Sequence, residues 1–193
     1  MRSVLRLAMA VAGLLTGTPA GAMPAQPWIA SATGDIDGDG VPDRAALSGD
    51  GDSVSLSVFL SGTAREPAGP VGPADVAPTI HRDGLGWMGD MEGQRPEIAV
   101  TARGSLTVVF QNEAIGRNRW RETLTIAHRG GVLVVAGYTH ESRDTLAPDA
   151  SSRCDVNLLT GKGEKNGTPF TVPARRVPVT EWTDAAVPQP CRP

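Results

Sequence analysis

Apolar and polar side chains alternate along several short stretches of the chain. In "SVSLSVFL" (53–60) every second residue from Val54 onward is apolar, and serines fill most of the intervening positions. A period of two places successive side chains on opposite faces of an extended strand, so this stretch predicts a strand that is buried on one face. The stretches "SLTVVF" (105–110) and "WRETLTIAH" (120–128) repeat the pattern.

Other segments complete the prediction of a sheet protein. "GVLVVAGYTH" is apolar on both faces and predicts a central strand, while "PEIAV", "CDVNLL", "RAAL" and "RRVPV" predict shorter ones. Gly130 and Gly131 supply the positive φ angles of a tight hairpin turn between two of these strands. Helix signals are confined to short turns such as "TEWTDAA". We therefore predict a mainly β protein with antiparallel sheets, arranged as a sandwich or an open barrel.

The first 22 residues have the three-part layout of a secretory signal peptide. Arg2 and Arg6 precede an apolar run over 7–15, and small residues end at Ala22. The alternative is an N-terminal membrane anchor, but the run is shorter than the roughly 20 residues that a span needs. We therefore expect residues 1–22 to be removed and the mature chain to be periplasmic or secreted, with no membrane span.

The mature chain divides at a segment rich in proline and glycine. We interpret residues 65–78 as a linker between an N-terminal β-hairpin (23–64) and a longer antiparallel β region (79–193). The hairpin is too short to hold a stable core alone. The two regions are therefore expected to pack together as one domain.

Two cysteines occur, Cys154 and Cys191. An exported chain with a single pair is expected to form one disulfide. The bridge would close a loop of 38 residues, counting both cysteines, and the chain-entropy treatment assigns it about 4 kcal/mol. It would attach the C-terminal tail to the body of the domain.

Charge and aromatic content restrict the partners that we expect. Removal of Arg2 and Arg6 with the signal leaves 16 basic and 21 acidic side chains, a net charge of −5. The chain has no basic stripe interleaved with aromatic residues, which argues against nucleic-acid binding. Its eight aromatic residues are few for a surface that stacks sugars, although the four tryptophans can contribute to one.

The most distinctive stretch is "GDIDGDGVPDRAAL" (34–47). Asp35, Asp37, Asp39 and Asp43 occupy positions 1, 3, 5 and 9 of a loop, and the carbonyl of Val41 falls at position 7. This is the order of oxygen ligands in the first nine positions of an EF-hand. Position 12 is an alanine where the EF-hand has a glutamate, and a predicted strand follows in place of a helix. The residue types favour calcium, with magnesium as the weaker alternative.

The stretch "GDIDGDGVPDRAALSGDGDSVSLSVFLSG" resembles the calcium loop of FG-GAP/VCBS repeats, which occur in integrin-like propeller blades and in many exported bacterial proteins. The resemblance implies that the four aspartates and the Val41 carbonyl bind a calcium ion. Those propellers repeat the loop in every blade, whereas it occurs once here, so a propeller is not predicted. The role expected for the metal is structural, because one short loop supplies all of its ligands.

Three functional hypotheses follow. The first is a non-enzymatic, exported calcium protein of the cell envelope that binds or adheres to an envelope or extracellular protein or glycan. The second is a small exported enzyme with an acid–base site near His128 and His140, together with Glu141 and Asp144. The third is an inhibitor or accessory subunit of an exported enzyme. The absence of a nucleophile motif or a paired set of glutamates favours the first.

Overall fold

The computed structural model describes residues 28–62 and 77–192 of the protein. The predicted signal peptide (1–22) and most of the predicted linker (65–78) lie outside these residues. Four strands form a small antiparallel sheet in the order β1-β2-β3-β4. They are β1 (Trp28–Gly34), β2 (Asp43–Asp50), β3 (Ser53–Phe59) and β4 (Ile80–Trp87). β4 follows the predicted linker yet pairs with β3, which precedes it.

A larger antiparallel sheet has the order β11-β10-β9-β8-β7-β6-β5, and β12 pairs with the first residues of β8. Its strands are β5 (Glu97–Val100), β6 (Leu106–Asn112), β7 (Asn118–Arg129), β8 (Val132–Asp144), β9 (Ala147–Asn157), β10 (Lys162–Lys165), β11 (Thr168–Thr171) and β12 (Val177–Pro178). The predicted fold class is confirmed: the protein is mainly β, with two antiparallel sheets that close into neither a barrel nor a propeller.

The alternating pattern predicts the buried faces of these strands correctly. Val54, Leu56 and Val58 of β3 are completely buried, while the serines between them are partly exposed. β8 is central in the large sheet, and residues 133–136 are buried on both of its faces, as the unbroken apolar run predicts. The β7–β8 hairpin turns at Gly130 and Gly131, whose φ angles of 56° and 80° are left-handed.

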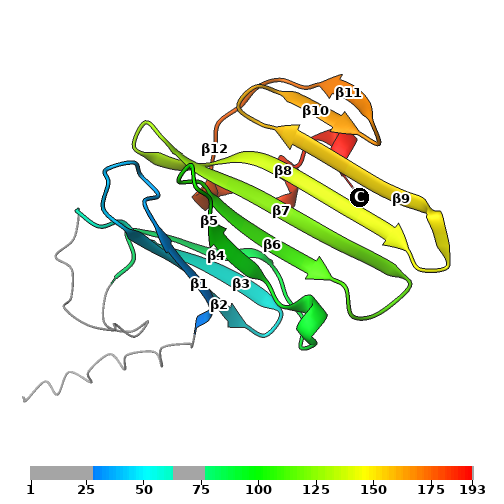
Figure 1. The fold of residues 1–193 in the computed structure, drawn as a ribbon, viewed down its shortest axis with the longest axis horizontal. Helices are drawn as coiled ribbons and strands as arrows, with labels where there is room; N and C mark the ends of the chain where they lie inside the picture. Colours follow the sequence, from blue (N-terminus) through cyan, green and yellow to red (C-terminus); the bar gives the residue numbers. More distant parts are fainter. Residues whose placement is uncertain (1–27, 63–76, 193) are drawn as a thin grey trace, which may run out of the picture.

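The core lies between the sheets and extends under the C-terminal segment. One cluster of buried side chains includes Leu47 and Val58 of the small sheet and Leu106 and Leu124 of the large one. Figure 1 shows the small sheet across the β5–β7 end of the large sheet, while β8–β11 extend beyond it. The two predicted regions thus share a single core.

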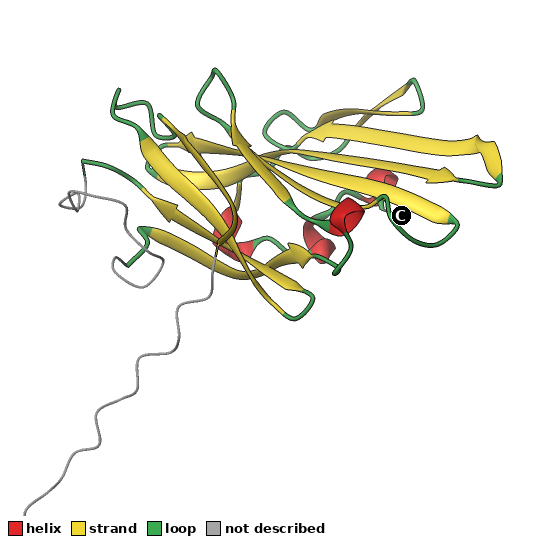
Figure 2. Ribbon diagram, turned by 60° about the horizontal axis from the view of Figure 1, so that its bottom comes forward, coloured by secondary structure: helices red, strands yellow, loops and turns green. Residues whose placement is uncertain are grey.

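The C-terminal segment covers a second part of the inner face of the large sheet. It contains three single 3₁₀ turns, η2 (Val179–Glu181), η3 (Asp184–Ala186) and η4 (Gln189–Cys191), which lie on the same side of the large sheet as the small sheet (Figure 2). A further 3₁₀ turn, η1 (Glu92–Gln94), precedes β5. Trp182 is 2% exposed, and its ring lies 5.9 Å from that of Tyr138 on β8.

The predicted disulfide is present. Cys154 of β9 is bonded to Cys191 of η4, and both cysteines are buried. The bridge therefore attaches the C-terminal segment to β9 of the large sheet. Among the described residues, no helix is long and apolar enough to cross a membrane.

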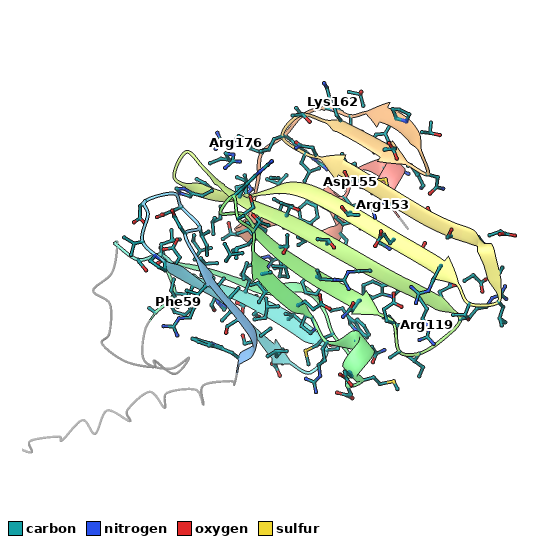
Figure 3. The ribbon with its side chains drawn as sticks, in the orientation of Figure 1. Phe59, Arg119, Arg153, Asp155, Lys162 and Arg176 are labelled. Atoms are coloured by element: carbon teal, nitrogen blue, oxygen red, sulfur yellow. A yellow bond between two sulfur atoms is a disulfide. The ribbon has the colours of Figure 1, made fainter. Side chains whose placement is uncertain are left out.

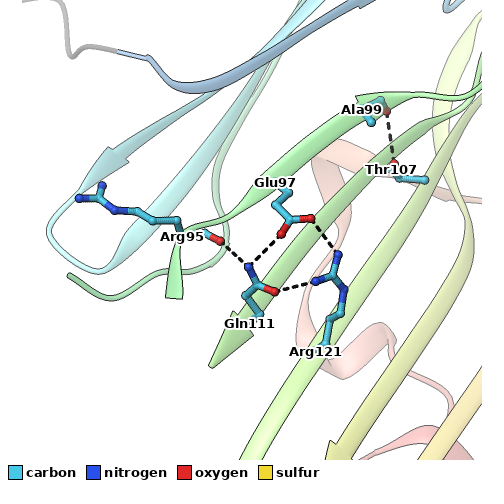
Figure 4. Close-up of polar contacts among 6 residues, drawn as sticks. All are labelled: Arg95, Glu97, Ala99, Thr107, Gln111 and Arg121. Carbon is cyan, nitrogen blue, oxygen red and sulfur yellow. Dashed lines mark hydrogen bonds and ion pairs between the residues drawn. The ribbon is translucent and has the colours of Figure 1, made fainter. Parts of the chain in front are cut away.

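The outer face of the large sheet carries a network of polar contacts between neighbouring strands. Gln111 of β6 donates hydrogen bonds of 3.0 Å to the Arg95 carbonyl and to the Glu97 carboxylate (Figure 4). Arg121 of β7 donates to the Gln111 side-chain oxygen at 2.7 Å and to Glu97 at 2.8 Å. These bonds tie β5, β6 and β7 together. Arg153, seen on β9 in Figure 3, pairs with a glutamate of β8.

Candidate metal centre

The aspartate loop connects β1 to β2 at one end of the small sheet. Gly34 pairs with Asp43 across the two strands, so the residues between them must turn within eight positions. The turn brings Asp35, Asp37 and Asp39 together: one carboxylate oxygen of each lies within 4.8 Å of the others. Three of the four predicted carboxylates therefore form one group.

The alternation within the loop has a physical cause. Ile36 is 3% exposed and belongs to the hydrophobic core, which turns the aspartates on either side of it outward. Gly38 and Gly40 have φ angles of 88° and 85°, a region that favours glycine. The sequence pattern thus combines an apolar anchor, carboxylates at alternate positions and glycines where the chain must turn sharply.

Backbone N–H groups hold the three carboxylates in place. Gly38 and Gly40 donate to the two oxygens of Asp35 at 2.7 and 3.0 Å. Asp37 and Asp39 each accept a bond from the N–H group two residues later, at 3.1 and 2.7 Å. A carboxylate oxygen has more than one lone pair, so these bonds orient the group and still leave electron pairs for a cation.

Asp43 is placed differently from the other three aspartates. Its side chain is 1% exposed, and one oxygen accepts bonds from the N–H groups of Ile36 and Asp37 at 2.7 and 3.3 Å. The other oxygen accepts from the Ser61 N–H at 2.7 Å. The group of three carboxylates does not include Asp43, and Val41 lies at the exposed tip of the loop. Their roles as metal ligands remain predictions.

Turns of the large sheet support the loop from outside. His128, at the end of β7, lies with Nδ1 3.1 Å from the Asp37 carbonyl oxygen, which can only accept, so this bond requires the proton on Nδ1. A Cβ atom on Gly104 would lie 2.6 Å from the Asp35 carbonyl oxygen, so only glycine allows this approach. The loop, these two residues and Arg103 line a depression of about 460 Å³.

The donor set suits a hard divalent cation such as calcium or magnesium, which prefers oxygen ligands. None of the ion pairs among the described residues involves Asp35, Asp37 or Asp39. Two like charges 4.8 Å apart repel by about 1 kcal/mol even in water. A bound cation would offset this repulsion. Cation binding is therefore a physical reason for placing three carboxylates so close together.

The two histidines of the alternative hypothesis do not form one site. His140 of β8 lies opposite Glu122 of β7 in the strand register, whereas His128 contacts the aspartate loop. Six positions of β7 separate Glu122 from His128, which corresponds to about 20 Å. Burial is the main cause that lowers the pKa of His140, and the charge of Lys165 adds to it.

The structure reveals an acidic residue that the sequence reasoning did not single out. Glu122 lies in register with Phe110 on one side and His140 on the other, on the face of β7 that carries buried Leu124. The Tyr138 hydroxyl donates to it at 3.1 Å. The sequence does contain a sign of this residue: in "WRETLTIAH", Glu122 occupies a position at which the alternation predicts an apolar side chain.

Burial raises the pKa of Glu122 to about 7; the Tyr138 hydrogen bond opposes this change and the charge of Asp184 adds to it. The unfolded chain releases the proton near the ordinary value of 4.5. The contribution of Glu122 to folding stability is therefore expected to be highest below that pH, to fall by up to about 3 kcal/mol as the pH rises to 7, and then to level off.

This pH dependence is checked by urea unfolding from pH 4 to 9. Glu122→Gln should remove the fall attributed to this group, and Glu92→Gln, at an exposed glutamate, should leave it unchanged. Equal pH profiles for the wild type and Glu122→Gln would contradict the expected protonation of Glu122.

Comparison of the chain with protein-family models, with curated proteins and with solved structures found no match.

Proposed function

We propose that this protein is an exported, calcium-binding β protein in which the metal is structural, and that it is a non-enzymatic binding, adhesion or accessory protein of the cell envelope. The group formed by Asp35, Asp37 and Asp39 carries the proposal, because its oxygens converge where the loop connects two strands. The single FG-GAP/VCBS-like loop pattern supports calcium over magnesium. The disulfide and the lack of a membrane-spanning helix among the described residues are compatible with export.

A structural role follows from what the loop contacts. It begins at the end of β1, leads directly into β2, and receives a hydrogen bond from His128 of the large sheet. A cation bound there would fix the junction between the two sheets. Its proposed ligands come from a single loop, and of the two histidines in the acid–base hypothesis only His128 contacts that loop, while His140 lies opposite Glu122.

Calcium is expected to raise the melting temperature of the mature protein. Extracellular calcium modules bind with dissociation constants of about 10⁻⁴–10⁻³ M. At about 10 mM calcium, such a site contributes about 1.4–2.7 kcal/mol to stability, which corresponds to an increase of about 3–10 °C. Thermal unfolding followed by circular dichroism, in calcium and in chelator, measures the increase.

Asp37→Asn and Asp39→Asn are the informative variants for this test. Asparagine keeps the side-chain oxygen that accepts the backbone N–H bond but removes the charge. Both variants should lose the calcium effect and should be as stable as the wild type, or slightly more stable, in chelator. A melting temperature that is indifferent to calcium in the wild type would disprove the metal site. Magnesium at the same concentration tests the choice of ion.

A further inference from the structure

A cleft opens on the inner face of the large sheet, beside the point where the small sheet meets the C-terminal segment. The small sheet covers β5–β7, and the C-terminal segment covers part of β8 and β9. Between them, Trp120 and Glu122 of β7 line a cleft of about 490 Å³. Its walls come from the β3–β4 end of the small sheet and from η3 of the C-terminal segment. The cleft is separate from the depression beside the aspartate loop.

Two tryptophans form the aromatic part of the cleft. The rings of Trp87 on β4 and Trp120 on β7 lie 5.7 Å apart and are inclined at 50°, and both side chains are half-buried. Phe110 is 2% exposed and lies against Gly86, where a Cβ atom would come within 2.4 Å of the phenyl ring. The missing side chain at Gly86 therefore lets the small sheet approach the floor of the cleft closely.

The charged groups of the cleft are mainly acidic. Asp52 and Asp184 are exposed, the first on the small-sheet wall and the second on the wall formed by η3, and Glu122 belongs to the large sheet at the floor. The only basic side chain among the described residues that line the cleft is that of Arg82. Its two terminal nitrogens donate to the carbonyls of Asp83 and Trp182, at 2.5 and 2.7 Å. Two of its donors are thus used by the protein backbone.

We propose that this cleft binds an organic ammonium group, such as a quaternary amine or the side chain of a lysine. The ammonium group contacts the exposed side of the tryptophan pair and is attracted by the carboxylates of the walls. A cation above a tryptophan face is stabilised by about 0.5–2 kcal/mol, with the larger values where water is displaced. Carboxylates on both sides add Coulomb attraction. The inference rests on the proposed binding role of the protein but not on the metal.

The pH dependence of binding follows from the groups that face Glu122. Tyr138 and His140 approach it from β8, Asp184 from η3, and Asp52 and Arg82 line the small-sheet wall. Deprotonation of Glu122 near pH 7 adds negative charge to the floor, so affinity for a cation should rise between pH 6 and 8. Loss of any proton from His140 as the pH rises acts in the same direction. We expect a change of roughly tenfold.

The test is isothermal titration of the mature protein with choline and with its neutral isostere 3,3-dimethylbutan-1-ol. Tighter binding of a lysine derivative blocked at both backbone ends would identify a peptide as the source of the ammonium group, and tighter binding of choline would identify a free amine. Cellobiose tests whether the cleft binds a neutral sugar instead. Calcium is held constant throughout. The variants are Glu122→Gln, Asp184→Asn and, as the matched control for charge, Asp149→Asn at an exposed aspartate of β9 that does not line the cleft.

The proposal predicts that choline or the lysine derivative binds at least tenfold more tightly than the isostere. Asp184→Asn should weaken binding about threefold to tenfold, and Glu122→Gln should remove most of the pH dependence. The proposal is overturned if choline and its isostere bind equally tightly, if only cellobiose binds, or if no ligand binds. It is also overturned if Asp149→Asn weakens binding as much as Asp184→Asn does. Asp37→Asn should bind choline normally, so failure of the metal hypothesis and failure of this one are distinguishable.

Discussion

Asp43→Asn is expected to destabilise the protein by roughly 3–5 kcal/mol, in calcium and in chelator alike. Both oxygens of the buried Asp43 carboxylate accept backbone N–H bonds, from Ile36 on one side and from Ser61 on the other. An asparagine offers one oxygen and one NH₂ group. In either orientation, one buried N–H donor loses its acceptor and faces another donor.

Asp37→Asn is the matched control, because it makes the same chemical change six residues away on a carboxylate that is not buried. In chelator, Asp37→Asn should be neutral or stabilising by about 1 kcal/mol, since it relieves repulsion within the group of three. Urea unfolding of both variants with and without calcium separates the two roles. Equal stabilities in chelator would show that Asp43 does not support the loop in the way we infer.

Loss of the Cys154–Cys191 disulfide is expected to lower stability by about 4 kcal/mol and the melting temperature by about 8–16 °C. The cysteines are 37 positions apart, and the bridge restricts the unfolded chain over that length. It also holds the C-terminal segment that places Trp182 in the core. Differential scanning calorimetry of the oxidised protein, the reduced protein and the double variant Cys154→Ala/Cys191→Ala measures the effect.

The double variant also provides the control for the reductant, which should have no effect on it. A reduced protein that melts within about 2 °C of the oxidised one would contradict the stabilising role. The same bridge bears on the cleft, since Asp184 lies between Trp182 and Cys191 in the attached segment. Reduction should therefore weaken choline binding even at temperatures at which the sheets remain folded.

The metal centre and the cleft use the two-sheet architecture in different ways. The metal centre is local in sequence, and the large sheet only supports it through contacts such as the His128 hydrogen bond. The cleft exists only because the small sheet and the C-terminal segment leave part of the inner face of the large sheet uncovered. The candidate metal site thus lies at one junction of the sheets and the cleft proposed to bind a ligand lies at another.

The sequence by itself determined those features that depend on neighbouring residues. The period of two in β3 and β7 identified strands and their buried faces, because alternation follows from the geometry of an extended chain. The glycine pair of the β7–β8 turn followed from its need for positive φ. Two cysteines allow only one intramolecular pairing, and the alternating aspartates lie within one loop. Each of these inferences required no knowledge of which strands are neighbours.

The tertiary structure alone decided the features that join distant segments. It placed β4 beside β3 across the predicted linker. It turned Asp43 inward because the N–H group of Ser61, 18 positions later, meets its carboxylate. It also brought Asp52, Glu122 and Asp184 around one cleft. Alternation specifies which face of a strand is buried but not what covers it, so these partners emerge only when the sheets and the C-terminal segment pack together.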